Sequence, residues 1–514
     1  MLDMIEHQCP DTLALCYADD TALVIKGFWK EAPTLMKVFQ EFAQISGLHL
    51  NFRKCIIMPL DEGGLDDFRT RLQQQLPAWK DMQVSRCGKY LGFYVGPDKG
   101  DRSWEEPTEK FLKRCELWGA QGTGLFYQTT AYNTFALSTL TYISQLESPP
   151  ASTLQAEIKG LRKVIKGPGQ WCQPADLWRL HEHYGQAKSC KSLSHTTAAA
   201  QLRVWRCDPA CRTNNYRLFT RDLQRSLCQG SNDVNRLRWI PWYERSFALR
   251  LEATKQDYTS NIGNIEDLVN VRARSASSGC TGSHSKPKSQ FQRKAYNQLL
   301  KADTYNATQR TRHKLQRYEL QNAIKNPLPA NTTCRQNTPA WCARRALANL
   351  QLLPKLVPSR VCAAAFSTQW NRWCTHRRFQ RRNQPSNRCL LGCGPHGEDS
   401  IEHYFACPIT RDALRRKLNL PDGLFANLHT AALCNANIRD TDCLATVALL
   451  NYALYTTTNQ LRSQPTLAAD IARDMLVQNL REGAKRHTHA TAVLDNRWNR
   501  QRHGTPLPPI PYTI

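Results

Sequence analysis

Two short apolar runs near the start of the chain are separated by an acidic turn. Residues 13–16 and 21–25 have the length and composition of strands, and Asp19 and Asp20 lie between them. This pattern predicts a β-hairpin that projects two carboxylates from its tip. Hard divalent cations such as Mg²⁺ prefer oxygen ligands, so the pair is a candidate metal site. The alternative is an ordinary surface turn, because Asp favours turns for purely local reasons.

Helical spacing dominates the chain after this hairpin. Apolar residues recur every three or four positions between Pro33 and Gly47, which predicts a helix that ends at the glycine. The same spacing returns between residues 102 and 250. There the apolar positions are Phe111, Cys115, Trp118, Tyr132, Phe135, Leu140, Tyr142 and Ile143.

A polar stretch divides the helical pattern into two parts. Residues 259–288 carry too little apolar surface to bury, so a flexible linker is expected there. The most apolar run, residues 443–454, is shorter than the roughly 20 residues of a membrane helix and predicts a buried core helix. Further helices are predicted at residues 292–320, from about residue 340, and at 411–418, 440–462 and 467–485.

A large excess of positive charge indicates a polyanionic partner. The 514 residues include 69 Lys and Arg against 43 Asp and Glu, a formal net charge of +26. Such an excess neutralises phosphates and releases their counterions, which makes nucleic acid the leading class of partner. The alternative is a merely basic protein. The cysteines are scattered and no signal peptide opens the chain, so we expect reduced thiols in an intracellular compartment.

Four cysteine and histidine residues have the spacing of a small zinc site. Cys389 and Cys393 form one short pair, and His403 and Cys407 form a second. Four nitrogen and sulfur ligands in two short pairs suit tetrahedral Zn²⁺. His396 is a lower-ranked substitute ligand. The alternative is a set of unrelated structural cysteines.

Aromatic and arginine residues alternate just before this group. Bases could stack on Trp370 and Trp373 while the guanidinium groups bind phosphates. Alternatively, a helix buries the Trp residues and exposes the Arg residues, and the sequence favours neither arrangement. Tyr404 and Phe405 are expected to pack against the segment that carries the two Trp residues. The candidate nucleic-acid-binding residues are Arg372, Arg377, Arg378, Arg381 and Arg382.

Three segments together resemble the reverse transcriptases of non-LTR retrotransposons. Residues 17–20 (YADD) are similar to motif C of the palm, and residues 47–55 (GLHLNFRKC) are similar to motif D. Residues 89–93 (KYLGF) resemble the motif E hairpin, which supports the primer end. The group at 389–407 resembles the Cys-Cys-His-Cys knuckle downstream of the thumb in many such elements, although its second pair is one residue shorter than usual.

The resemblance implies a reaction and the residues that serve it. In the family enzyme the primer 3′-hydroxyl attacks the α-phosphate of a nucleotide, and two metal ions stabilise the transition state. Asp19 would bind Mg²⁺, Asp20 would be a second carboxylate, and Lys54 would protonate or neutralise the pyrophosphate. The implied partners are an RNA template and a DNA primer or target, with no membrane partner. The nucleus is the implied compartment.

We therefore expect an α+β protein in which a small antiparallel β palm remnant precedes mainly α-helical thumb and C-terminal regions with a zinc knuckle. Only about sixteen residues precede the YADD segment, too few for the fingers and the first palm Asp of the family. A C-terminal portion that is inactive alone is the expectation, and a non-catalytic nucleic-acid-binding remnant is the alternative. The expected regions are 1–100 (palm remnant), 101–255 (thumb), 256–300 (flexible linker), 301–385 (basic helical region), 386–410 (zinc knuckle) and 411–514 (helical tail).

Overall fold

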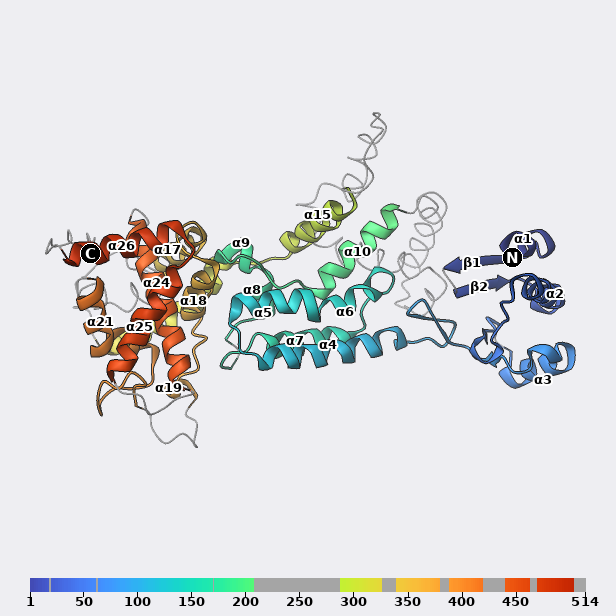
Figure 1. Cartoon of the computed structure of the whole chain (residues 1–514), viewed down its shortest axis with the longest axis horizontal. Coiled ribbons are helices and arrows are strands. Elements are labelled where there is room, and N and C mark those ends of the chain that lie inside the picture. The colour runs from blue at the N-terminus through green and yellow to red at the C-terminus, as the bar shows by residue number, and fades with distance from the viewer. Residues whose placement is uncertain are drawn as a thin grey trace, which may run out of the picture. The chain divides into compact units, whose positions relative to one another are not determined.

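The protein is mostly helical and carries only small sheets in the part of the chain that the structure describes (Figure 1). The structure is a computed structural model, and it falls into two compact units, residues 1–109 and 110–514. The finer division into six regions stays a prediction. The described residues are 1–17, 20–61, 63–169, 171–207, 287–325, 339–379, 388–418, 440–462 and 469–502.

The first unit is built around the predicted hairpin. Strands β1 (Thr12–Tyr17) and β2 (Asp20–Ile25) are antiparallel, with Tyr17 opposite Asp20 at the tip. Side chains alternate across a strand, so one face of the hairpin packs on a helical core while the other stays exposed. The buried core residues of this unit are Ile5, Cys9, Ala32, Leu35, Val38, Leu72, Leu76, Trp79 and Val84.

The predicted helix after the hairpin is α2 (Phe28–Ser46), and Gly47 ends it in a left-handed conformation as expected. The pair β3–β4 is parallel, which differs from the uniformly antiparallel sheet expected here. Each pair stands as a separate two-stranded sheet. The other elements of this unit are α1 (Leu2–Gln8), η1 (Phe52–Lys54), β3 (Ile56–Ile57), α3 (Leu65–Gln75), η2 (Pro77–Trp79), β4 (Gln83–Val84), β5 (Gly88–Tyr90) and β6 (Phe93–Val95).

The segment that resembles motif E is a tight hairpin. Strands β5 and β6 pair antiparallel, with Tyr90 opposite Phe93. The two residues between them, Leu91 and Gly92, have φ values of 48° and 85°. Positive φ at both central positions is the requirement of a type I′ turn, whose twist matches that of the flanking strands. The hairpin prediction is therefore confirmed for this segment.

Apart from the β-bridge between Arg388 and Glu398, the regular secondary structure of the second unit's described residues is helical. Its first helices, α4 (Arg102–Ala120) and α7 (Ala151–Val164), approach closely because Gly160 leaves room for Phe111 and Cys115. A Cβ at Gly160 would lie only 2.5 Å from the Phe111 ring. The neighbouring elements are α5 (Leu125–Ala131), the π-helix η3 (Tyr132–Ala136), α6 (Ser138–Thr141), η4 (Ile143–Gln145), α8 (Pro174–Trp178), α9 (Leu180–Tyr184) and α10 (Leu193–Cys207).

Two helices replace the single helix predicted at residues 292–320. They are α15 (Pro287–Ala302) and α16 (Ala307–Lys325), and the chain breaks at Asp303 between them. The expected flexible linker, 256–300, lies mostly outside the described residues. Its last part is helical, because α15 packs on α10 and buries Ala295 and Leu300. The linker prediction is thus wrong for that part.

The C-terminal helices enclose the most apolar stretch of the sequence. Helix α24 (Thr441–Arg462) is buried from Cys443 to Leu450 and packs on α25 (Ala469–Ala484) and α18 (Ser359–Gln369), as Figure 1 shows for the first pair. The buried core helix is thereby confirmed. Among the described helices, none joins sufficient length with sufficient apolarity to cross a membrane. The remaining elements are α17 (Pro339–Leu352), η9 (Leu353–Lys355), α19 (His376–Phe379), α20 (Ile401–Ala406), α21 (Pro408–Leu418) and α26 (Thr488–Arg502).

A buried carboxylate joins α7 to the start of α10. Glu157 is only 2% exposed, and it accepts a hydrogen bond of 2.8 Å from the backbone N–H of Leu193. Burial raises the pKa of Glu157 to about 7, because the interior disfavours the charged form. The Leu193 bond lowers this pKa but does not offset burial.

We expect Glu157 to make the stability of the second unit fall as pH rises. Its folded pKa lies above the unfolded value of roughly 4.3, so its stabilisation is complete below pH ~4.3 and is lost as pH rises through about 7. Glu157→Gln should flatten this dependence by up to about 1.4 kcal/mol per pH unit. The test is urea unfolding of the full chain between pH 5 and 8. Glu116→Gln, the same change at an exposed position, should keep the wild-type dependence, and identical profiles for wild type and Glu157→Gln would contradict the assignment.

Candidate metal centre and the acidic hairpin

The structure brings the four predicted zinc ligands together. The ligand atoms of Cys389, Cys393, His403 and Cys407 all lie within 4.8 Å of one another. Cys389 Sγ is 3.9 Å from Cys407 Sγ, and Cys393 Sγ is 3.2 Å from His403 Nε2. In a tetrahedron with Zn–S bonds of roughly 2.3 Å the sulfur atoms are roughly 3.8 Å apart. The group could therefore hold a metal ion such as zinc.

A tight hairpin turn supplies the first ligand pair. Arg388 and Glu398 form an isolated antiparallel bridge, and Cys389 donates its backbone N–H to the carbonyl of Gly397 at 2.8 Å. Gly397 is needed here, since an added Cβ would collide with Cys393 Sγ and lie 2.7 Å from the Cβ of Cys389. Close approach of the backbone, which only glycine allows, thus closes the ligand cluster.

A short helix supplies the second ligand pair. Ser400 caps α20, and its hydroxyl accepts a hydrogen bond from the backbone N–H of His403 at 3.1 Å. His403 and Cys407 are four residues apart, so they lie on the same side of the helix end. His396, the lower-ranked substitute, is exposed and does not belong to the cluster.

The cluster favours a thiolate even before a metal is considered. A hydrogen bond from the Cys389 thiol outweighs the effect of burial and lowers the pKa of Cys407 to about 4. His403 and the backbone N–H groups of Ile409 and Thr410 add to this effect. The same bond raises the pKa of Cys389, because its thiol must keep the proton that it donates. Thiolates are the form that binds Zn²⁺.

The metal-ligand segment is packed on aromatic side chains. Trp373 lies with its ring centroid 6.2 Å from that of Tyr404 and 6.3 Å from that of Phe405, as expected from the sequence. On its other side it meets Tyr455 of α24 in an edge-to-face contact at 5.4 Å. Trp370 and Trp373 are each 1% exposed, so the described structure has them in the core and not available for bases.

The five candidate arginines before the cluster differ in their surroundings. Arg372 is buried, donates from Nε to the carbonyl of Lys166 at 2.8 Å, and lies 4.9 Å from the Trp171 ring. Arg372 is therefore part of the core and is not available to contact a nucleic acid. Arg377 is exposed and lies 3.3 Å from Glu398. The side chain of Arg378 and all of Arg381 and Arg382 lie outside the described residues.

The acidic hairpin is described only on either side of its turn. Asp20 is exposed at the start of β2, opposite Tyr17, while Asp19 lies outside the described residues. Lys54 is exposed in η1, and its neighbour Phe52 packs on the same core as the hairpin. In the part of the chain that the structure describes, the Cys/His cluster is the only group of three or more candidate metal ligands. Mg²⁺ binding by Asp19 and Asp20 stays a prediction.

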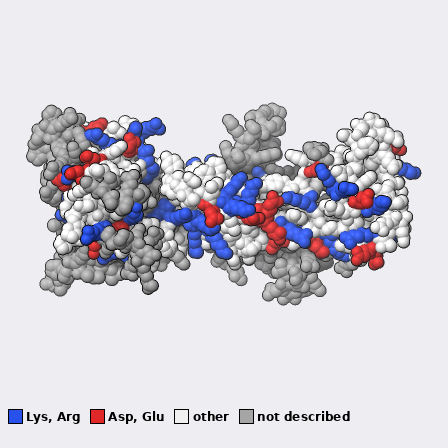
Figure 2. All heavy atoms as spheres, turned by 60° about the horizontal axis from the view of Figure 1, so that its bottom comes forward, with Lys and Arg blue, Asp and Glu red and all other residues white. Residues whose placement is uncertain are grey.

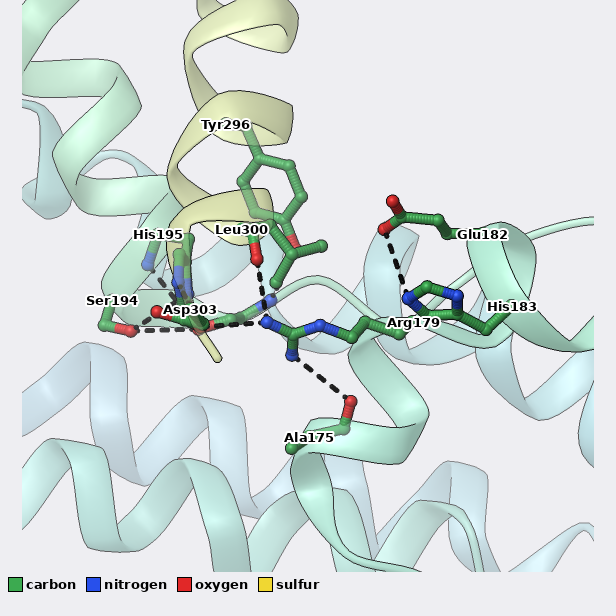
Figure 3. Close-up of polar contacts among 10 residues, drawn as sticks. Ala175, Arg179, Glu182, His183, Ser194, His195, Tyr296, Leu300 and Asp303 are labelled. Atoms are coloured by element: carbon green, nitrogen blue, oxygen red, sulfur yellow. Dashed lines mark hydrogen bonds and ion pairs between the residues drawn. The ribbon is translucent and has the colours of Figure 1, made fainter. Parts of the chain in front are cut away.

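Sequence reasoning missed a polar cluster between α9 and α15, which Figure 3 shows. Asp303 lies 3.0 Å from Nε2 of His195 and 3.1 Å from Nη2 of Arg179, whose side chain is almost fully buried. Burial alone would raise the pKa of Asp303, but the bonds and charges of His195 and Arg179 lower it. These partners are too far apart in the sequence for spacing to reveal them.

The same cluster contains a hydroxyl, an imidazole and a carboxylate in contact one after another, as in the catalytic triad of serine hydrolases. Ser192 Oγ lies 2.8 Å from Nδ1 of His195, which in turn reaches Asp303. However, Ser192 is fully buried, and its hydroxyl accepts the backbone N–H of His195 at the start of α10. A nucleophile needs access to its substrate, so this arrangement acts as a helix cap and not as a catalytic site.

Comparisons with known proteins give no family for this chain. No protein-family model matches it, and no curated protein matches it.

We expect the chain to bind one Zn²⁺ through the Cys/His cluster. Cys407→Ser should remove the bound zinc, because Cys407 is fully buried and no neighbouring cysteine of the cluster can replace its thiolate. Metal analysis of the purified full chain measures this. Cys374→Ser is the matched control, since Cys374 is an exposed free cysteine outside the cluster. Zinc in both variants, or in neither variant nor the wild type, would contradict the assignment.

Proposed function

We propose that this chain is a nucleic-acid-binding part of an RNA-directed DNA polymerase of the non-LTR retrotransposon type. The observation that carries the proposal is the convergence of Cys389, Cys393, His403 and Cys407 directly after an arginine-rich run. A zinc ion held there would fix a small turn-rich segment that has little core of its own. The net charge of +26 supports a polyanionic partner.

The polymerase class rests on the resemblance of the first unit. The YADD segment, which includes the end of β1 and the start of β2, is followed by Lys54 after α2 and by the tight β5–β6 hairpin, in the order of motifs C, D and E. Under this hypothesis Asp19 binds Mg²⁺, Asp20 is a second carboxylate, and Lys54 protonates or neutralises the pyrophosphate. RNA as template and DNA as primer or target are the proposed partners.

A second candidate is a binding protein without catalysis. It is favoured by one observation: in the described part of the chain no further carboxylate or histidine joins Asp20 to form a group of metal ligands. Phosphoryl transfer by two metal ions needs a set of carboxylates that holds both ions. The hairpin would then be a structural remnant, while the zinc segment keeps its role in binding.

Polymerase activity tests whether this chain is catalytic by itself. We expect no template-dependent, Mg²⁺-dependent nucleotide incorporation by the purified chain, because the hairpin alone supplies only part of the carboxylate set. Primer extension with and without Mg²⁺ measures this. Incorporation that disappears in Asp19→Ala but persists in Asp3→Ala, an exposed aspartate of the same unit, would show that the expectation is wrong and the chain is an active polymerase.

Nucleic-acid binding itself is tested by its dependence on salt. Affinity for RNA or DNA should fall steeply with salt, with a log–log slope of roughly −0.7 to −0.9 per phosphate contact. Arg377→Ala with Arg378→Ala should lower both affinity and slope. The charge-matched control is Lys485→Ala with Arg486→Ala, which removes two exposed cations just after the C-terminal end of α25. The N-terminal end of α25 is the end that lies against Gly392 of the metal-ligand segment. A flat salt dependence of the wild type would contradict the proposal.

A further inference from the structure

A stacked pair of aromatic rings, one half-buried and one exposed, lies on the second unit, on elements that carry none of the metal ligands. Trp118 of α4 and Phe135 of η3 stack with ring centroids 4.8 Å apart and an angle of 16° between their planes. Phe135 is 45% exposed even though Trp118 covers one of its faces. Among the described residues, Phe135 thus keeps exposed surface on which a further flat group could stack. We call these two residues the aromatic platform.

The backbone holds Phe135 outward. It belongs to a π-helix, Tyr132–Ala136, whose first and last residues are fully buried. The widened turn therefore anchors at both ends and presents its middle to solvent. Arg114 ties α4 to this turn, since its Nη1 donates a hydrogen bond of 2.7 Å to the carbonyl of Phe135. Isolated π-helical turns are rare and frequent at functional sites.

Cations border the platform. Besides Arg114, Lys110 lies one turn earlier on α4 and is exposed. On the side of α7, Lys163 lies 3.5 Å from Glu116. A Cβ at Gly119, which follows the platform residue on α4, would lie 3.4 Å from Cε of Lys166. Figure 2 shows Lys and Arg side chains, with some Asp and Glu among them, over the middle of the view, where α4 and α7 lie.

We infer that the aromatic platform binds an unpaired base of single-stranded nucleic acid, while the bordering cations bind the adjacent phosphates. An open aromatic face beside cations provides the two contacts that such a strand needs. A base on the free face of Phe135 extends a stack that already exists, so little reordering of side chains is required. The interior of a duplex keeps its bases stacked on one another and cannot use this face. The inference rests on the proposed binding of nucleic acid and adds the site and the form of the ligand.

The test separates stacking from charge. Labelled oligo(dT) of about 12 nucleotides is compared with the same strand carrying abasic sites, which keeps every phosphate and removes bases. The full chain should bind the intact strand roughly five- to a hundred-fold more tightly, the range that one stacked base supplies. Phe135→Ala should remove most of this preference without changing the salt slope, and Phe135→Trp should restore it. Tyr127→Ala, which removes an exposed aromatic side chain from the neighbouring α5, should keep the preference.

The possible outcomes distinguish this inference from the function on which it rests. Salt-dependent binding in which Phe135→Ala leaves the preference for bases unchanged would overturn the platform and leave nucleic-acid binding intact. Equal binding of intact and abasic strands would have the same meaning. Absence of binding to either strand would overturn both proposals. A blunt duplex should bind equally well to wild type and Phe135→Ala, and a loss with the duplex would also contradict the platform.

Discussion

One buried carboxylate, Asp399, joins the metal-ligand segment to the helical core of the second unit. Its oxygens accept the backbone N–H of His376 at 2.8 Å, the hydroxyl of Tyr404 at 2.7 Å and the guanidinium of Arg462 at 2.8 Å. Asp399 is only 4% exposed, and a buried charge without such partners would be strongly destabilising. Arg462, at the end of α24, is one of the partners of this buried carboxylate. Through Asp399 it therefore also attaches one end of the turn that carries Cys389 and Cys393 to α24.

This attachment changes what a metal ion would do in the protein. An isolated zinc module takes most of its folding energy from the metal. Here Tyr404 and Phe405 also pack on Trp373, which in turn contacts α24. The protein core already holds the second ligand pair in place, and Asp399 holds one end of the turn that carries the first pair. A metal ion would chiefly fix the rest of that turn. The metal-ligand segment is thus continuous with the core.

Local patterns predicted the elements and ligands that depend on local spacing. The paired strands β1 and β2, α2 with Gly47 at its end, α24 and the Cys/His group follow from periodicity, turn residues and short ligand pairs. Spacing does not predict the surroundings of a residue when its partner is distant in the sequence. The sequence around Arg372 is typical of a surface cation, yet its side chain is buried and contacts the Trp171 ring and the carbonyl of Lys166. Asp303 follows the end of α15 within the predicted helix, and its carboxylate binds Arg179, which is distant in sequence.

The buried cations also alter the meaning of the net charge. Arg372 and Arg179 are almost fully buried, and Arg310 is engaged at 2.7 Å with the buried Asp176. None of these three charges can release counterions from a phosphate backbone, so the +26 of the sequence exceeds the charge available for binding. The charges that remain for this purpose are those of exposed helix faces such as α4 and α7. On such faces a few cations gain selectivity only when a flat aromatic surface lies beside them, because phosphates alone do not distinguish single strands from duplexes.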